Sequence, residues 1–212
     1  MNCPKCALCG GKAAPYSSAP HYFVCENCGF VFLNRTKVVS RQDEKERYLK
    51  HTNDQGDAGY TKMLEEFIKI CVAPFAHAPG PALDYGSGPE PVLAGILEKM
   101  GYKVDIYDPF FAPAADFDPG KYGIVTAVEV IEHMKCPLSD IRIIADILKP
   151  GGIFAGRTMF LTKEDFALWW YRLDITHISF YSRESLSYIA LETGMKTILF
   201  KEPCFFVMKK NG

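Results

Sequence analysis

Two glycines near the middle of the chain are spaced as in loops that hold a nucleotide. Gly86 and Gly88 flank one serine directly after a short apolar run, and Asp108 follows twenty residues after Gly88. Glycines let a backbone approach a ligand closely and turn sharply into a helix. A carboxylate at the end of the next strand can accept hydrogen bonds from both hydroxyls of a ribose. These residues predict a site for a ligand that contains a ribose diol.

Two neighbouring residues indicate which ligand the loop favours. The dinucleotide fingerprint has a third glycine where this chain has Pro91. Asp84, just before the loop, is unfavourable beside a pyrophosphate but suits the ammonium and sulfonium groups of S-adenosylmethionine. We therefore expect S-adenosylmethionine as the cofactor, bound by Asp84, Gly86, Gly88 and Asp108. An oxidoreductase that uses a dinucleotide is the disfavoured alternative.

The cysteines cluster at the start of the chain. Four of them form two Cys-x2-Cys turns, fifteen residues apart and each followed by glycine, namely Cys6, Cys9, Cys25 and Cys28. This spacing is typical of a four-cysteine zinc site. Cys3 could pair with Cys6 instead, but only the turn that ends at Cys9 repeats the following glycine. A unit this small cannot bury enough surface to fold alone, so we expect a bound zinc ion to stabilise it.

Acidic and imidazole side chains follow two of the later predicted strands. Glu129 ends a strand predicted over 123–130, and His133 lies in the adjoining loop. His177 comes after a strand predicted over 153–158, in an Asp-Ile-Thr-His segment. An imidazole at this rim can act as a general base, so His177 and Glu129 are our candidate catalytic residues. The alternative for His177 is a hydrogen bond to a backbone carbonyl that shapes its loop. For His133 we expect a structural or cofactor-packing role.

Strands and helices alternate from residue 81 onward. The expected strands span 82–85, 103–107, 123–130, 153–158, 195–200 and 205–209, and the expected helices span 91–100, 139–148 and 182–194. Such alternation is typical of a parallel sheet covered by helices on both faces. The last two strands are close in sequence and should form an antiparallel hairpin. We predict an α/β fold with a Rossmann-like, mostly parallel sheet.

Three regions differ in composition. Residues 1–36 hold the cysteine turns and two predicted strands, and we assign them to a zinc-ribbon-like module. Residues 37–80 begin as a polar stretch and then place apolar residues at helical spacing from Tyr60 to Val72, so we expect a helical connector or lid. Residues 81–212 form the main domain.

The overall composition excludes several classes of protein. Apolar residues make up 48% of the chain and the formal net charge is −1, which lowers the expectation of a nucleic acid partner. No apolar run approaches the roughly 18 residues that would span a bilayer. We expect a cytoplasmic protein that contacts no membrane. The sequence leaves its oligomeric state open.

Four ordered motifs resemble those of class I S-adenosylmethionine-dependent methyltransferases over roughly residues 80–208. They are Leu83-Asp84-Tyr85-Gly86-Ser87-Gly88, Tyr107-Asp108-Pro109, Ala127-Val128-Glu129-Val130-Ile131-Glu132-His133 and Leu148-Lys149-Pro150-Gly151-Gly152. The four-cysteine ribbon, His51-Thr52-Asn53, Tyr-Asp-Pro-Phe-Phe and Asp-x-Thr-His also resemble a small bacterial group of such enzymes.

The resemblance implies further roles. Pro109 lies in the acidic ribose motif, and Phe110 would pack against the adenine face, with Asp116 as a weaker candidate for an adenine contact. Segments before the first strand would form a lid over the cofactor and bring in Tyr60. His51 and Asn53 belong to that lid too, unless the segment is only a solvated linker. Most class I enzymes fit a helix and a third strand after the acidic motif, but about 14 residues precede Gly123 here. We expect strand three to be short or absent.

The sequence thus predicts a methyltransferase that acts on a small-molecule acceptor. One alternative keeps this activity but lets the ribbon direct methylation of RNA or protein, although basic residues near the ribbon are few. A non-catalytic protein that retains the cofactor pocket is another alternative. Trp169, Trp170 and Tyr171 fit packing at the core or rim better than a substrate box.

Overall fold

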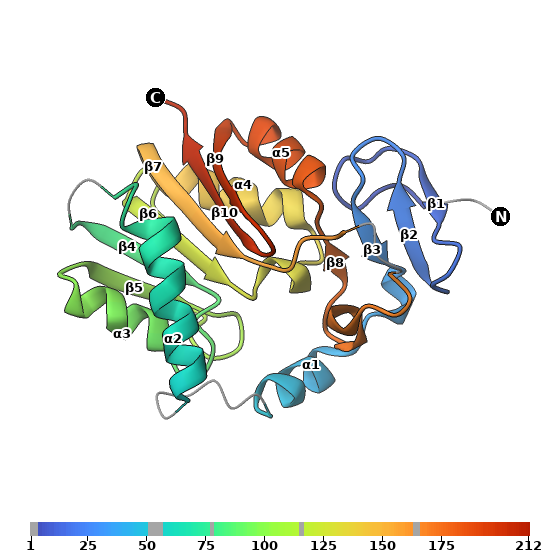
Figure 1. The fold of residues 1–212 in the computed structure, drawn as a ribbon, viewed down its shortest axis with the longest axis horizontal. Helices are drawn as coiled ribbons and strands as arrows, with labels where there is room; N and C mark the ends of the chain where they lie inside the picture. Colours follow the sequence, from blue (N-terminus) through green and yellow to red (C-terminus); the bar gives the residue numbers. More distant parts are fainter. Residues whose placement is uncertain (1–3, 51–56, 77–78, 115–116, 163–165) are drawn as a thin grey trace.

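The computed structural model describes residues 4–50, 57–76, 79–114, 117–162 and 166–212 and contains two sheets. The smaller sheet is antiparallel, with strand order β1-β2-β3-β8 (Figure 1). Its strands are β1 (Ala13–Pro15), β2 (Tyr22–Cys25), β3 (Val31–Leu33) and β8 (Ser179–Phe180). Three strands thus come from the N-terminal cysteine-containing region, and the fourth comes from far along the chain.

The larger sheet has six strands in the order β5-β4-β6-β7-β10-β9. They are β4 (Pro81–Tyr85), β5 (Lys103–Tyr107), β6 (Tyr122–Val128), β7 (Leu148–Arg157), β9 (Met195–Lys201) and β10 (Phe205–Lys210). The first four in this order are parallel, and β10 runs antiparallel to both of its neighbours. The predicted Rossmann-like sheet with a C-terminal antiparallel hairpin is confirmed. The described residues between β5 and β6 form no strand, as expected for the missing strand three.

Helices cover both faces of this sheet (Figure 1). On one face lie α2 (Ala58–Phe67), the π-helical turn η2 (Ile68–Val72) and α3 (Val92–Lys99), and on the other lie α4 (Pro137–Ile147) and α5 (Arg183–Glu192). Alternate residues of each strand feed the two cores: Ile124 packs with the first set of helices, while Val125 packs with the second. Each strand therefore contributes one set of side chains to the core on each face of the sheet.

Shorter elements lie at the edge where the parallel strands end. They are η1 (Arg35–Lys37), α1 (Arg41–Tyr48), η3 (Ile131–His133) and η4 (Trp170–Leu173). Between β7 and β8, the helical structure of the described residues is limited to η4. Among the described helices, none is long and apolar enough to cross a membrane.

Two predicted boundaries were wrong. Leu148 is expected from the sequence to end a helix, but it is the first residue of β7, because the helix already stops at Ile147. The strand expected to run to Val130 ends at Val128. Glu129 follows with a φ of 54°, a left-handed conformation that extended backbone cannot adopt. The chain therefore turns at Glu129 and directs the following residues along the edge of the sheet.

Candidate active site

A cavity of about 1140 Å³ opens at the carboxyl ends of the parallel strands. The strand order reverses between β4 and β6, the position at which open α/β sheets bind their ligands. Nine of the predicted site residues line this cavity: Tyr60, Gly86, Gly88, Asp108, Pro109, Phe110, Glu129, His133 and His177. The fold thus brings together residues that lie more than a hundred positions apart in sequence.

The glycine loop is held in one shape by backbone contacts. The N–H groups of Gly86 and Ser87 both donate to the carbonyl oxygen of Tyr107, at 2.7 and 3.0 Å. Gly86 has a φ of 83°, and a Cβ there would lie 2.4 Å from a methyl carbon of Val130. Gly88 also has a positive φ, 67°, but a Cβ there would have no atom of the described residues within 4 Å. At position 86, both the positive φ and the nearby Val130 side chain require glycine, whereas at position 88 only the positive φ does.

Asp108 joins the two loops of the cofactor side. Its Oδ2 accepts a hydrogen bond from Gly88 N–H at 3.1 Å, and its Oδ1 accepts from the N–H groups of Phe110 and Phe111 at 2.8 and 3.1 Å. A carboxylate offers about four lone-pair positions, so one is left for an added donor. This geometry suits one charge-assisted hydrogen bond to a ribose hydroxyl more directly than the two that the sequence suggested.

Asp84, predicted as a cofactor contact, is not among the described residues that line the cavity. It is 4% exposed, and its Oδ1 accepts a hydrogen bond from the Thr126 hydroxyl at 3.2 Å. Burial raises the pKa of Asp84 to about 7. Its charge still reaches Tyr60, whose pKa is raised to about 12 by burial and by the charges of Asp84 and Glu129. The structure therefore places Asp84 directly behind the cavity wall.

A buried network of charges forms the opposite side of the cavity. Glu129 pairs with the Arg157 guanidinium and accepts a hydrogen bond from the Tyr171 hydroxyl at 3.2 Å. The same hydroxyl also lies within hydrogen-bond distance of Glu132, which is fully buried, and the other oxygen of Glu132 has no hydrogen-bond partner among the described residues. Burial and the neighbouring Glu129 raise the pKa of Glu132 well above its ordinary value. Burial also raises the pKa of Glu129, although the Arg157 guanidinium beside it opposes that rise. The network therefore places two carboxyl groups with raised pKa values around one tyrosine hydroxyl.

Both histidines are oriented by backbone carbonyls. His177 Nδ1 lies 2.7 Å from the Tyr171 carbonyl oxygen, and His133 Nδ1 lies 3.0 Å from that of Thr176. A carbonyl only accepts hydrogen bonds, so each Nδ1 carries the proton and the lone pair of the neutral ring lies on Nε2. The backbone hydrogen bond that was the alternative for His177 is thus present, and it leaves the tautomer that a general base needs.

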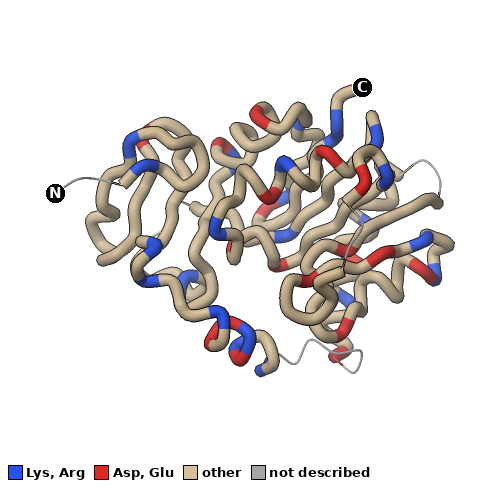
Figure 2. Tube along the Cα trace, turned by 180° about the vertical axis from the view of Figure 1, so that it is seen from behind, with Lys and Arg blue, Asp and Glu red and all other residues tan. Residues whose placement is uncertain are grey.

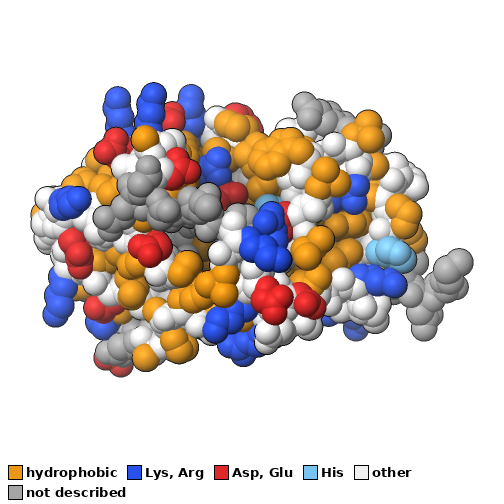
Figure 3. All heavy atoms as spheres, turned by 90° about the horizontal axis from the view of Figure 1, so that it is seen from below, with side chains coloured by type: hydrophobic (Ala, Val, Ile, Leu, Met, Phe, Trp, Pro, Cys, Tyr) orange, Lys and Arg blue, Asp and Glu red, His pale blue; other side chains and the backbone are white. Residues whose placement is uncertain are grey.

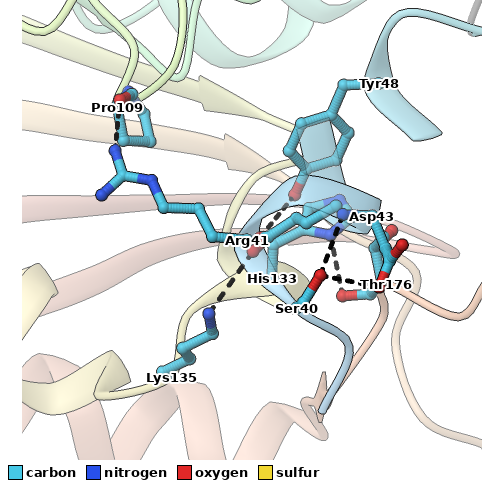
Figure 4. Close-up of polar contacts among 9 residues, drawn as sticks. Ser40, Arg41, Asp43, Tyr48, Pro109, His133, Lys135 and Thr176 are labelled. Carbon is cyan, nitrogen blue, oxygen red and sulfur yellow. Dashed lines mark hydrogen bonds and ion pairs between the residues drawn. The ribbon is translucent and has the colours of Figure 1, made fainter. Parts of the chain in front are cut away.

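Helix α1 lies over the mouth of the cavity, through contacts that the sequence did not identify. Arg41 donates to the Pro109 carbonyl oxygen at 2.9 Å and stacks on Phe110, and the Tyr48 ring lies 5.2 Å from that of His133 (Figure 4). Further contacts join Glu44 to Lys135 and Arg47 to Asp174. The helix is polar on nearly every side, which in sequence indicates a solvated connector. Its pairing partners are distant in the chain, so no local signal could reveal them.

The four predicted metal-binding cysteines lie together in the smaller sheet. Their sulfur atoms are all within 4.8 Å of one another, with Cys6 and Cys28 at 3.8 Å and Cys9 and Cys25 at 3.4 Å. A tetrahedral zinc site with Zn–S bonds of about 2.3 Å has sulfur atoms roughly 3.8 Å apart. The donor set therefore fits zinc.

Other predicted residues fall elsewhere. His51, Asn53 and Asp116 lie outside the described residues. Trp170 lines the cavity but is 64% exposed, and Tyr171 is buried. Sequence reasoning missed Arg157, whose only sequence signal is its place at the end of β7.

The methyltransferase domain family matches residues 60–199, which include the glycine loop, Asp108, Glu129 and His177. The chain belongs to this family. Residues 60–199 are therefore an S-adenosylmethionine-dependent methyltransferase domain.

Matches to relatives of this domain are short. A ubiquinone biosynthesis O-methyltransferase of Aliivibrio fischeri is 36% identical over 70 residues, or 33% of this chain and 30% of that protein. One from Xanthomonas campestris is 44% identical over 50 residues, or 24% of this chain and 21% of that protein. The chain thus matches less than a third of the length of these relatives.

Solved structures share the fold at low identity. An O-methyltransferase family protein of Burkholderia thailandensis has a TM-score of 0.59 at 14% identity, with 80% of this chain and 63% of that chain covered. A 1,6-didemethyltoxoflavin-N1-methyltransferase of the same organism has a TM-score of 0.53 at 11% identity, with 81% and 84% covered. These likenesses show the shared architecture of the methyltransferase domain.

Proposed function

We propose that this chain transfers a methyl group from S-adenosylmethionine to a small-molecule acceptor. The observation that carries the proposal is one continuous cavity that joins the glycine loop and Asp108 to the Glu129–Tyr171–His177 side. Its volume, about 1140 Å³, is slightly larger than that of ordinary ligand pockets, which suits a cofactor and an acceptor held together. Methyl transfer needs little more than such alignment, because the cofactor supplies the reactive sulfonium.

The chain's own residues divide between the two halves. Gly86, Gly88 and Asp108 would hold the ribose end, and Phe110 would pack against the adenine. Tyr60 lies on the neighbouring wall. Glu129, which directly follows β6, lines the same cavity, and we expect its carboxyl group to face the cationic end of the cofactor.

The acceptor side favours a molecule with an apolar body. Trp170 and Leu173 line the cavity mouth and are 64% and 66% exposed, so an apolar acceptor would cover them. Hydrophobic side chains also surround charged ones on the face that carries α1 (Figure 3). The charged residues around the smaller sheet are mostly basic but few and separate, so they offer only a weak site for RNA phosphates (Figure 2).

We assign His177 as the general base. Its Nδ1–H is held by the Tyr171 carbonyl, and Nε2 would accept the proton that the acceptor loses as its oxygen or nitrogen attacks the methyl group. We also propose a structural zinc ion at Cys6, Cys9, Cys25 and Cys28.

The direct test is a screen with methyl-labelled cofactor and three sets of acceptors: small phenols and amines, RNA, and protein. Label transfer to a small molecule is expected, and His177→Gln should then slow turnover at least tenfold while S-adenosylhomocysteine affinity is kept. Binding of NAD but not of S-adenosylhomocysteine, measured by calorimetry, would refute the proposal. Turnover by His177→Gln at the wild-type rate would remove the general-base role alone.

A further inference from the structure

The smaller sheet and the acceptor side of the cavity share a strand. β8 pairs with β3, so that Val31 lies opposite Phe180 and Phe32 opposite Ser179. The Leu33 N–H also donates to the Ile178 carbonyl oxygen at 2.9 Å. Ile178 directly follows His177 in the chain. The last strand of the cysteine-containing module therefore fixes the backbone one residue away from the candidate base.

Aromatic packing connects the same two regions. Tyr22 of β2 lies 5.1 Å from the ring of Phe166 and 5.8 Å from that of Phe180, measured between ring centroids. Phe166, Phe180 and Trp169 contact one another, and Trp169 lies 5.2 Å from Tyr171. Tyr22 and Tyr171 are both buried in this cluster. One tyrosine of the N-terminal module thus supports the packing behind the cavity wall.

Tyr171 has one side in that cluster and the other in the site. Its hydroxyl lies within hydrogen-bond distance of both Glu132 and Glu129, and its carbonyl oxygen accepts a hydrogen bond from the Nδ1 of His177. Tyr171 therefore contacts both carboxyl groups and the imidazole at once. A shift of Tyr171 would disturb the two carboxyl groups and the orientation of the imidazole together.

The cysteine turn is bonded directly to the start of β3. The Cys25 N–H donates to the Phe30 carbonyl oxygen at 2.9 Å, and the Gly29 N–H donates to the Cys25 carbonyl oxygen at 3.1 Å. Val31 then begins β3 only three residues after Cys28. A metal ion held by these cysteines would fix this turn, and with it the strand that pairs with β8.

We propose that the N-terminal module is a built-in wall of the acceptor site. It positions Tyr171 and His177 through the β3–β8 pairing and through the Tyr22 side chain, and metal binding at the four cysteines keeps that wall in place. Tyr22 is a positioning residue, because it contacts neither the cavity nor a reacting atom. That this wall borders an acceptor site rests on the proposed function. Whether the N-terminal module holds the wall in position can be measured without any acceptor.

The chain contains its own probes of the wall. Its two tryptophans are Trp169 and Trp170, and both lie in the segment between the aromatic cluster and the cavity mouth. Tryptophan emission and its quenching by acrylamide therefore report on this segment alone. Binding of S-adenosylhomocysteine reports separately on the glycine loop and Asp108, which belong to the opposite half of the cavity.

The experiment uses the full chain, purified under reducing conditions with its zinc content measured. Zinc is removed from the wild type with excess chelator and then restored. In parallel, Tyr22→Ala deletes the ring, Tyr22→Phe keeps it, and Glu26→Ala changes an exposed residue of the same cysteine turn as a matched control. Emission, acrylamide quenching, zinc content and S-adenosylhomocysteine affinity are measured for each sample.

Chelation should red-shift the emission and raise the quenching constant at least about twofold, because the wall opens locally while the larger sheet stays folded. Zinc should reverse the change. Tyr22→Ala should show it with zinc still bound, whereas Tyr22→Phe and Glu26→Ala should match the wild type. S-adenosylhomocysteine should still bind throughout, because the glycine loop and Asp108 are built on β4 and β5, and any loss of affinity would report only the contact with Glu129.

Unchanged tryptophan emission after zinc loss would overturn the proposal, and so would protein that binds no zinc when freshly reduced. If Tyr22→Ala fails to fold, the chelation of the wild type decides the question. Loss of S-adenosylhomocysteine binding in the untreated wild type would instead refute the proposed function and leave the measured coupling standing.

Discussion

Substitution of Gly86 by alanine tests how the cofactor loop is built. The new Cβ would lie 2.4 and 2.8 Å from the two γ-carbons of Val130. Val130 is β-branched and cannot easily turn away, so its backbone or the loop must shift. Overpacking of this kind costs about 1–3 kcal/mol. The φ of 83° adds about 1–2 kcal/mol for a residue with a Cβ. The unfolding free energy should therefore fall by about 2–5 kcal/mol.

Gly88→Ala is the matched control for that substitution. Gly88 has a similar φ, 67°, but its new Cβ would have no atom of the described residues within 4 Å. It should lose only the backbone contribution of about 1–2 kcal/mol. The difference between the two variants isolates the contact with Val130, and Gly86→Ala combined with Val130→Ala should recover part of it.

Urea unfolding followed by circular dichroism measures these free energies, and calorimetry with S-adenosylhomocysteine measures the loop itself. Affinity should fall more for Gly86→Ala than for Gly88→Ala, because a shift of the first glycine also strains its N–H bond to Tyr107. Equal destabilisation of the two variants would show that the loop is not packed against Val130 and would refute this reasoning.

Three further predictions concern charge and metal. Asp108→Asn should weaken S-adenosylhomocysteine binding at least about tenfold, because it replaces a charge-assisted acceptor, while the exposed Asp118→Asn should not. The pKa of Asp84 is raised to about 7, so the folded state keeps a proton that the unfolded chain releases near pH 4. The unfolding free energy of the wild type should therefore fall from pH 5 to 8 relative to that of Asp84→Asn. Urea midpoints of the two proteins that change equally with pH would contradict this. Cys28→Ser should reduce bound zinc to near zero by metal analysis, whereas Cys136→Ser, at an exposed cysteine, should retain one equivalent.

The order of elements in the larger sheet was predictable because its signals are local. The loop from Asp84 to Gly88 and the turn at 149–152 each mark the end of a strand or helix within a few residues. The short stretch after Asp108 correctly indicated the missing strand. Boundaries failed where tertiary contacts decide the backbone: Glu129 leaves the strand early and pairs with Arg157, which lies 28 residues away. No propensity of the residues around 129 carries that information.

Site residues could be predicted where their role depends on neighbours in the sequence, and could not where it depends on contacts with distant parts of the chain. Gly86 and Gly88 could be predicted because glycine itself permits the backbone conformation that the loop needs. By contrast, Asp84 has the charge expected of a ligand contact, but it is buried behind the described residues that line the cavity, and its role as a cofactor contact stays a prediction. Helix α1 shows the same limit, since its residues look solvated until Pro109, His133 and Lys135 are placed beneath them (Figure 4).

The division of the chain at residue 36 illustrates why composition and structure differ. The cysteine turns and their strands form a compositional unit, yet that unit lacks one strand of its sheet and most of its aromatic cluster. Residues 166–180 supply both the missing strand and the missing aromatic rings, although the sequence assigns these residues to the methyltransferase domain. If the N-terminal module folded independently, Tyr22 and Val31 would be exposed on its surface, at a cost of about 1.5–3 kcal/mol for each side chain. Their complete or near-complete burial against Phe166 and Phe180 therefore argues that the two parts form one cooperative structure.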